Sequence, residues 1–253
     1  MNKKLLPFLL LAVLFTVTYF ACKKADKKPA VDPTNEYYPL QIGKYVIYNV
    51  DSTLWDDTLC VVQIRHHQMM YTVADTFTDA QGRLSYRVDV RMRHQTEDEW
   101  EPHSVFYVTG TSTTLETIHS GLHFINLQFP IANGTSWKGN AYVNTTDPDL
   151  TYFSNWDYTY SNVGGSFNNG VVVYNNTVTV NERDETIGDP DNIPRQPATR
   201  NLSKEVYASG IGMIYRQYIH WTYDPGSIQN NDPNNPNRCR KGNGVVMMAV
   251  DHN

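Results

Sequence analysis

The sequence is poor in cysteine and in positive charge, and both shortages exclude classes of protein. It has three Cys in 253 residues, and neither Cys60 nor Cys239 has another cysteine two to four residues away, so zinc-finger spacing is absent. Lys and Arg total 21 against 26 Asp and Glu, which gives a net charge of -5. Because binding to a phosphate backbone requires clustered Lys and Arg, we expect no nucleic acid partner.

Motifs of the common catalytic sites are missing as well. The sequence contains no GxSxG, no SxxK and no glycine-rich phosphate loop, and its eight His include no HExxH pair. We therefore predict that the protein is not an enzyme and has no catalytic residue, cofactor or metal ion. One alternative stays open, a hydrolase that uses an acidic cluster, and the two clusters are Glu97, Asp98, Glu99 and Glu101, and Glu182, Asp184 and Glu185.

Long apolar runs are absent except at the N-terminus, and the mean hydropathy of -0.49 excludes a protein with many membrane spans. Lys3 and Lys4 precede an apolar run that ends at Ala21, and Cys22 follows. This pattern predicts a signal peptide over residues 1–21. It resembles a bacterial lipoprotein signal, which implies diacylglycerol on Cys22 and a protein anchored to the membrane by lipid. The alternatives are a simple membrane anchor or a signal peptide without lipidation.

The segment after Cys22 has the composition of a tether. Residues 22–35 are rich in Lys, Asp and Pro and show no apolar period, so we expect a flexible linker. Lys23 follows the lipidation site, where lipoproteins kept at the inner membrane often have Asp. The resemblance therefore implies the outer membrane, with the protein facing the periplasm.

The rest of the chain alternates apolar and polar residues with a period of two, which predicts antiparallel β-strands. Residues 69–77 and 84–92 form a hairpin around the turn Asp79–Arg83. Eight further strands are expected near residues 45–50, 59–65, 104–109, 123–129, 152–160, 172–180, 213–223 and 245–250. No segment of 12 or more residues has a helical period. We predict an all-β protein of about ten strands, with few or no helices, in one curved antiparallel sheet that forms a half-barrel or open barrel.

Two proline-rich segments are predicted as long loops, residues 184–201 and 224–243. Strands on either side of the chain's midpoint look alike, so residues 36–253 are predicted to form a single domain.

Three short motifs resemble uncharacterised periplasmic lipoproteins of diderm bacteria. They are Tyr38–Tyr45, the GxxWxG element Gly134–Gly139, and Glu205–Ile214. The resemblance implies a half-barrel like that of lipoprotein-carrier proteins, and it implies no reaction. Trp137 is expected to pack over the open edge of the sheet.

Two modifications of an exported chain follow from particular residues. Cys60 and Cys239 would meet an oxidising compartment, which favours a disulfide between them, and the alternative is two free thiols. Ser52 and Thr58 lie in Asp-Ser/Thr-apolar patterns that resemble O-glycosylation sites of some periplasmic proteins.

Aromatic residues are numerous enough to form a binding surface, since the chain has 17 Tyr, 5 Trp and 9 Phe. Candidates for lining a ligand groove are Trp137, Trp156, Tyr158, Tyr160 and Trp221, and the alternative for each is a place in the sheet core. We therefore expect a non-enzymatic envelope protein that binds an apolar or glycan ligand or a partner protein. The second hypothesis is an accessory subunit that scaffolds an envelope complex through the two long loops.

Overall fold

A computed structural model describes residues 34–231 and 238–253 of the chain. The predicted signal peptide, Cys22 and the tether up to residue 33 lie outside the described residues. Residues 33–253 make up one compact unit, which contains all the elements below. Within the described part of the chain, no helix has the length and hydropathy needed to cross a membrane.

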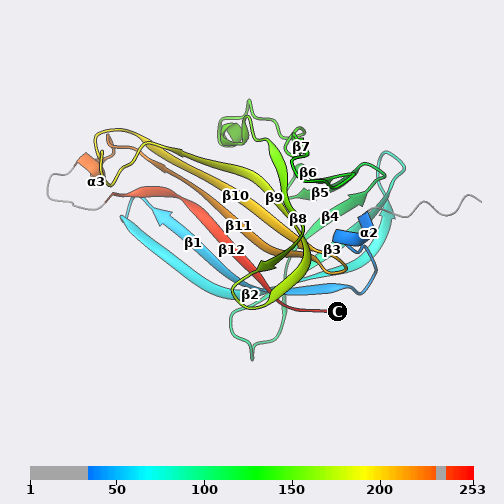
Figure 1. Ribbon diagram of the computed structural model, residues 1–253. Helices are drawn as coiled ribbons and strands as arrows, with labels where there is room; N and C mark the ends of the chain where they lie inside the picture. The colour runs from blue at the N-terminus through cyan, green and yellow to red at the C-terminus, as the bar shows by residue number, and fades with distance from the viewer. Residues whose placement is uncertain (1–33, 232–237) are drawn as a thin grey trace, which may run out of the picture. The chain divides into compact units, whose positions relative to one another are not determined.

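The described residues form one twelve-stranded antiparallel sheet, which confirms the all-β prediction (Figure 1). The strands are β1 (Tyr45–Asp56), β2 (Val61–Thr78), β3 (Leu84–Arg93), β4 (Glu101–Gly110), β5 (Thr114–His119), β6 (Leu122–Gln128), β7 (Ser136–Trp137), β8 (Tyr158–Asn168), β9 (Val173–Ile187), β10 (Ala198–Ala208), β11 (Gly212–Tyr223) and β12 (Arg240–His252). The helices are α2 (Thr34–Tyr37), α3 (Ile228–Asn231) and the 3₁₀ helix η1 (Pro148–Phe153). Helix α2 includes Thr34 and Asn35, which the sequence assigned to the tether.

From β1 to β6 and from β7 to β12 each strand pairs with the next one in the chain, and β12 also pairs with β1, so the sheet curls into a nearly closed barrel. The order is β6-β5-β4-β3-β2-β1-β12-β11-β10-β9-β8-β7, which leaves β6 and β7 as the two edges. Such a meander joins strands by short hairpins and needs no crossover.

The two edges meet at a seam held by Trp137, Gly139 and Tyr160. The indole Nε1 of Trp137 donates to the carbonyl of Ile125 in β6 at 2.7 Å, and the amide of Ile125 donates to the carbonyl of Gly139 at 2.6 Å. The hydroxyl of Tyr160 bonds to both the amide and the carbonyl of Gln128. Gly139 is required here because a Cβ would lie 2.2 Å from the Tyr158 ring.

The hairpin predicted over residues 69–92 is confirmed, although one residue of it faces outward. Strands β2 and β3 pair around the turn in which Asp79 and Arg83 share a backbone hydrogen bond. A bulge between Val73 and Asp75 shifts the register, so Phe77 lies on the other face from Val73 and is 39% exposed. The predicted strands 59–65 and 69–77 are parts of the single 18-residue strand β2.

Three predictions about the second half of the chain are wrong at their boundaries. Residues 152–157 are not part of a strand, because Asp147 caps a 3₁₀ helix over Pro148–Phe153 and β8 begins only at Tyr158. The loop predicted over 184–201 is shorter, since β9 continues to Ile187 and β10 begins at Ala198. The loop predicted over 224–243 includes helix α3 and ends where β12 begins at Arg240.

Cys60 and Cys239 form a disulfide that joins distant parts of the chain. Cys60 lies in the turn between β1 and β2, and Cys239 directly precedes β12. The bond therefore ties the turn that follows the first strand to the start of the last strand.

Candidate functional site

The inner face of the barrel carries a half-open cavity of about 360 Å³. Its lining combines apolar side chains, among them three methionines, with polar groups on the same and neighbouring strands. The lining residues are Tyr38, Tyr48, Met69, Tyr71, Val90, His103, Ser104, Phe106, Thr117, His119, Ser120, Asn126, Glu205, Tyr207, Met213, Arg216, Val245 and Met247. The volume lies at the lower end of the range for small-molecule sites, roughly 300–1,000 Å³.

An ion pair between buried Glu205 and partly exposed Arg216 lies in the lining of the cavity. Strands β10 and β11 bring the two residues directly opposite one another, and Arg216 Nη1 lies 3.3 Å from Glu205 Oε1. The other oxygen of Glu205, Oε2, accepts from the hydroxyl of Tyr207 and from Asn126 Nδ2. Burial alone would lower the pKa of Arg216, but the charges of Glu205 and Glu182 outweigh it and raise that pKa.

A second buried carboxyl group, Glu182, lies beside this pair without lining the cavity. Its Oε2 accepts from the hydroxyl of Ser203. Burial, with a further contribution from the charge of Glu205, raises the pKa of Glu182 to about 8. Glu182 is therefore mostly protonated at neutral pH, which reduces the negative charge next to the ion pair.

Aromatic side chains line the cavity where the chain enters the barrel. The backbone carbonyl of Glu36 in α2 accepts from Gly210, and this bond holds Tyr38 beside the Tyr207 ring at 6.1 Å. The Tyr48 and Tyr71 rings meet edge to face at 5.0 Å. Burial raises the pKa of Tyr48 and Tyr207, so both hydroxyls act as neutral hydrogen-bonding groups.

A second open groove adjoins the cavity at Val245 on the same inner face. This inner groove, about 320 Å³, is lined by Ser52, Thr53, Leu54, Gln63, Arg65, Tyr218, Asn243, Gly244 and Val245. Val245 lines both spaces, and it pairs with Ser52 on one side and Tyr218 on the other. The strands that form the groove, β1, β2, β11 and β12, are among the long ones in Figure 1.

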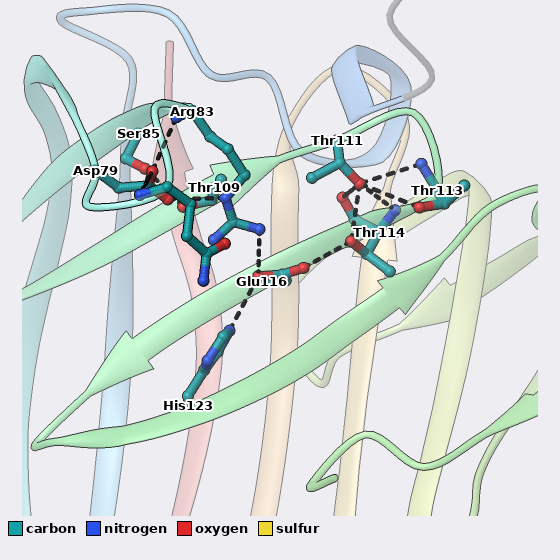
Figure 2. A network of polar contacts seen from close by, with 10 residues as sticks. Asp79, Arg83, Ser85, Thr109, Thr111, Thr113, Thr114, Glu116 and His123 are labelled. Atoms are coloured by element: carbon teal, nitrogen blue, oxygen red, sulfur yellow. Dashed lines mark hydrogen bonds and ion pairs between the residues drawn. The ribbon is translucent and has the colours of Figure 1, made fainter. Parts of the chain in front are cut away.

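A separate polar network surrounds Glu116 in β5, as Figure 2 shows. Glu116 Oε2 lies 3.0 Å from Arg83 Nη1 and 3.0 Å from His123 Nε2, and Thr114 donates to Oε1. Arg83 also pairs with Asp79, so the network ties the β2–β3 turn to β5 and β6. Burial opposes ionisation of Glu116, but the hydrogen bonds from Thr114, Arg83 and His123 outweigh it and lower its pKa. Both oxygens of the Glu116 carboxylate accept hydrogen bonds from the protein, so we assign this network a structural role.

None of the five aromatic residues predicted to line a ligand groove lines this cavity. Trp137, Tyr158 and Tyr160 pack together in the core, with ring centroids 5.7 Å and 4.5 Å from Trp137. Trp156 is also buried, and it donates to the carbonyl of Tyr152. Trp221 lies on the outer face, opposite Gly242, with Arg240 stacked over its ring at 4.9 Å.

The other predicted site residues are placed as follows. Ser52 is half-buried in the inner groove, whereas Thr58 is exposed in the β1–β2 turn. In the first acidic cluster, Glu97, Asp98 and Glu99 lie in the exposed loop between β3 and β4, and Glu101 is the first residue of β4. Among residues 34–231 and 238–253, no group of three His, Cys, Asp or Glu is close enough to hold a metal ion.

The sequence analysis missed Arg216 because a bulge inverts the face of β11. Met213 pairs with Tyr207 and Tyr215 pairs with Val206, so Ile214 is an extra residue. Beyond it the side chains at 216, 218 and 220 face inward, and those at 215, 217, 219 and 221 face outward. A usable signal was Gly212 beside Met213, since glycine in a strand often marks a bulge.

The fold and the cavity define an antiparallel up-and-down β-barrel protein with an internal, mostly apolar site. No protein-family model matches the sequence, and none of the curated proteins matches it. One solved structure is similar, a "putative exported protein with YMCC-like fold" from Bacteroides fragilis NCTC 9343. The match has a TM-score of 0.38 and 10% identity, and it covers 85% of this chain and 99% of that chain. This similarity is too low to define a shared fold, and the description applies to that protein alone.

Proposed function

We propose that this protein is a non-enzymatic binding protein of the bacterial envelope whose barrel holds a small ligand. The observation that carries the proposal is the half-open cavity of about 360 Å³, which is lined by apolar side chains and a few convergent polar groups. Sites of this kind bury most of a ligand's surface, and their polar groups set its orientation.

The cavity favours binding over hydrolysis. A glycosidase needs two carboxyl groups that face the substrate from opposite sides. Glu205 lines the cavity, but Glu182 does not, and Glu205 is already bound by Tyr207, Asn126 and Arg216. We therefore propose that neither carboxyl group acts as an acid or base in a reaction.

A neutral fluorescent probe, N-phenyl-1-naphthylamine, tests the proposal. We expect its emission to rise on mixing with the purified protein, because the probe leaves water for the cavity. The variant Met247→Trp should lose this signal, since Met247 lines the cavity and is nearly fully buried. Met248→Trp is the matched control, because the adjacent side chain points to the other face. Equal probe binding by both variants, each shown to be folded, would place the probe outside the barrel and refute the proposal.

We also propose that Cys22 is lipidated and anchors the protein to the outer membrane, facing the periplasm. The support is the sequence pattern of Lys3, Lys4, the apolar run and Ala21 before Cys22. In a diderm bacterial host, Cys22→Ser should move the protein from the membrane fraction to the soluble fraction. Retention of the variant in the membrane fraction would contradict lipid anchoring at this residue.

A second candidate function, docking to a partner protein, is favoured by apolar residues near the disulfide. Leu59 and Ile228 are 66% and 87% exposed. Gln229 donates to the carbonyl of Thr58, which holds helix α3 beside the β1–β2 turn. Exposed apolar groups that lie together often mark a contact surface. A double change, Leu59→Ser with Ile228→Ser, should abolish co-purification of an envelope partner while leaving probe binding unchanged.

A further inference from the structure

We infer that the ligand of the cavity is a small amphiphile with an anionic oxygen group, a carboxylate or a phosphate, that binds Arg216. Its single apolar chain or ring would lie against the three methionines that line the cavity, Met69, Met213 and Met247. This inference rests on the proposed function and adds the chemical class of the ligand.

Arg216 has donor capacity that the protein does not use. A guanidinium group carries five N–H donors. Its Nε is covered by protein atoms and has no hydrogen-bond partner in the described part of the chain. The ion pair with Glu205 is 3.3 Å long, whereas strong charge-assisted bonds are roughly 2.7–2.9 Å. Yet 39% of the Arg216 side-chain surface is uncovered, and the residue lines the cavity.

Glu205, by contrast, has little acceptor capacity left. Its carboxylate already accepts from Tyr207 and Asn126 and pairs with Arg216. A cationic ligand would have to break these bonds, while an anionic one would meet the open side of the guanidinium. Further groups that can donate hydrogen bonds line the cavity, and they are His103, Ser104, His119 and Ser120.

The apolar side chains that line the cavity suit an apolar chain. They are Met69, Met213 and Met247, with Phe106 and Val90, and Met247 lies directly beside Arg216 on the neighbouring strand. The cavity volume of about 360 Å³ suits one short chain better than a lipid with several chains. A longer chain would pass Val245 into the inner groove, where Leu54 is 45% exposed.

Competition for the bound naphthylamine probe tests this inference. We expect decanoate and decyl phosphate each to displace the probe about tenfold more tightly than decan-1-ol, since an added ion pair of about 1.4 kcal/mol corresponds to that ratio. Acetate, which has the charge without the chain, should not displace the probe. The ratio between decanoate and decyl phosphate shows which oxyanion is preferred.

Two variants locate the anionic group. The double change R216Q/E205Q removes both charges together and so leaves no unpaired buried ion, and it should bind decanoate and decan-1-ol equally. Glu205→Gln alone should bind decanoate more tightly than the native protein, because Arg216 loses its competing partner. Arg87→Gln, which changes an arginine that does not line the cavity, should leave the preference unchanged.

The possible failures are distinguishable. If the native protein binds no probe, the proposed function fails. If the probe binds but decanoate and decan-1-ol displace it equally, the inference about Arg216 is wrong and the proposed function stands. If R216Q/E205Q does not fold, Glu205→Gln decides alone, and unchanged or weaker decanoate binding by that variant overturns the inference.

Discussion

At the scale of single residues, Glu182 links the stability of the barrel to pH. Burial raises its pKa from 4.5 to about 8. Between these values the folded protein holds a proton that the unfolded chain has released. Raising the pH through this window therefore lowers the free energy of unfolding, by at most about 1.4 kcal/mol per pH unit.

The variant Glu182→Gln tests this linkage. The amide oxygen can still accept from Ser203, but the side chain has no proton to lose. We expect the native protein to lose stability relative to this variant by about 1 kcal/mol per unit between pH 6 and 8, measured by urea unfolding. Glu97→Gln in the exposed β3–β4 loop is the control and should keep the native slope. Parallel pH profiles for the native protein and Glu182→Gln would refute the buried-acid interpretation.

A second prediction at the scale of single residues concerns the hydrogen bonds of the buried carboxylate of Glu116. Replacing it with Gln weakens the bonds from Arg83 and His123 in Figure 2 at a position that is 6% exposed. Because hydrogen bonds to a buried charged group contribute about 1.5–3 kcal/mol, we expect a loss of about 2 kcal/mol in urea unfolding.

The matched control for Glu116 is Asp75→Asn, also a carboxylate paired with an arginine. Asp75 and Arg87 are 55% and 37% exposed, so solvent screens their pairing and no measurable change is expected. A similar loss in both variants would show that exposure does not decide the strength of these two pairs.

At the scale of elements, the seam between β6 and β7 depends on side chains. Trp137→Phe removes the donor to the Ile125 carbonyl. We expect a loss of about 1 kcal/mol and faster hydrogen exchange of the β6 amides, because the edge strand opens more readily.

Trp156→Phe is a matched control for the seam. It also removes an indole hydrogen bond, to the carbonyl of Tyr152, but that bond lies away from β6. It should cost similar stability without faster exchange in β6. Equal exchange rates in the two variants would mean that Trp137 does not hold the edges together.

The elements that the sequence predicts well are those whose signals are local. The hairpin of β2 and β3 follows from alternation on both sides of a turn whose residues bond to Asp79. The segment 152–157 fails because Tyr152 and Trp156 show a strand-like alternation, while Asp147 and Pro148 start a 3₁₀ helix. Local capping therefore outweighs the aromatic pattern.

The candidate site is harder to predict because it depends on pairing between strands. Glu205 meets Arg216 only in the register that the bulge at Ile214 produces. Without that extra residue, Trp221 would face inward, as the sequence analysis expected, and Arg216 would face solvent. The alternation of residues predicts that Tyr158 and Tyr160 share one face of a strand. It does not predict whether that face lines the cavity or packs in the core, because this depends on contacts with other strands.

At the scale of the whole molecule, the disulfide restrains the unfolded chain more than any local contact does. Its cysteines are 179 residues apart, and the chain-entropy estimate for such a loop is about 5 kcal/mol. We expect the double change Cys60→Ser with Cys239→Ser to lower the free energy of unfolding by several kcal/mol, up to that estimate. A reducing agent should destabilise the native protein to the same extent and have no effect on the variant. A variant as stable as the oxidised native protein would contradict this restraint.

The position of β12 between β1 and β11 has a consequence for the order of assembly. Strands β1–β6 form one ribbon and β7–β11 form a second, and the thirteen residues of β12 supply the strand pairing that joins the two. A chain that emerges from the ribosome or a translocation pore with its N-terminus first presents eleven strands before this one. The closing strand is thus the last to arrive, and until then both ribbons expose an unpaired flank, at β1 and at β11, that a chaperone would have to shield.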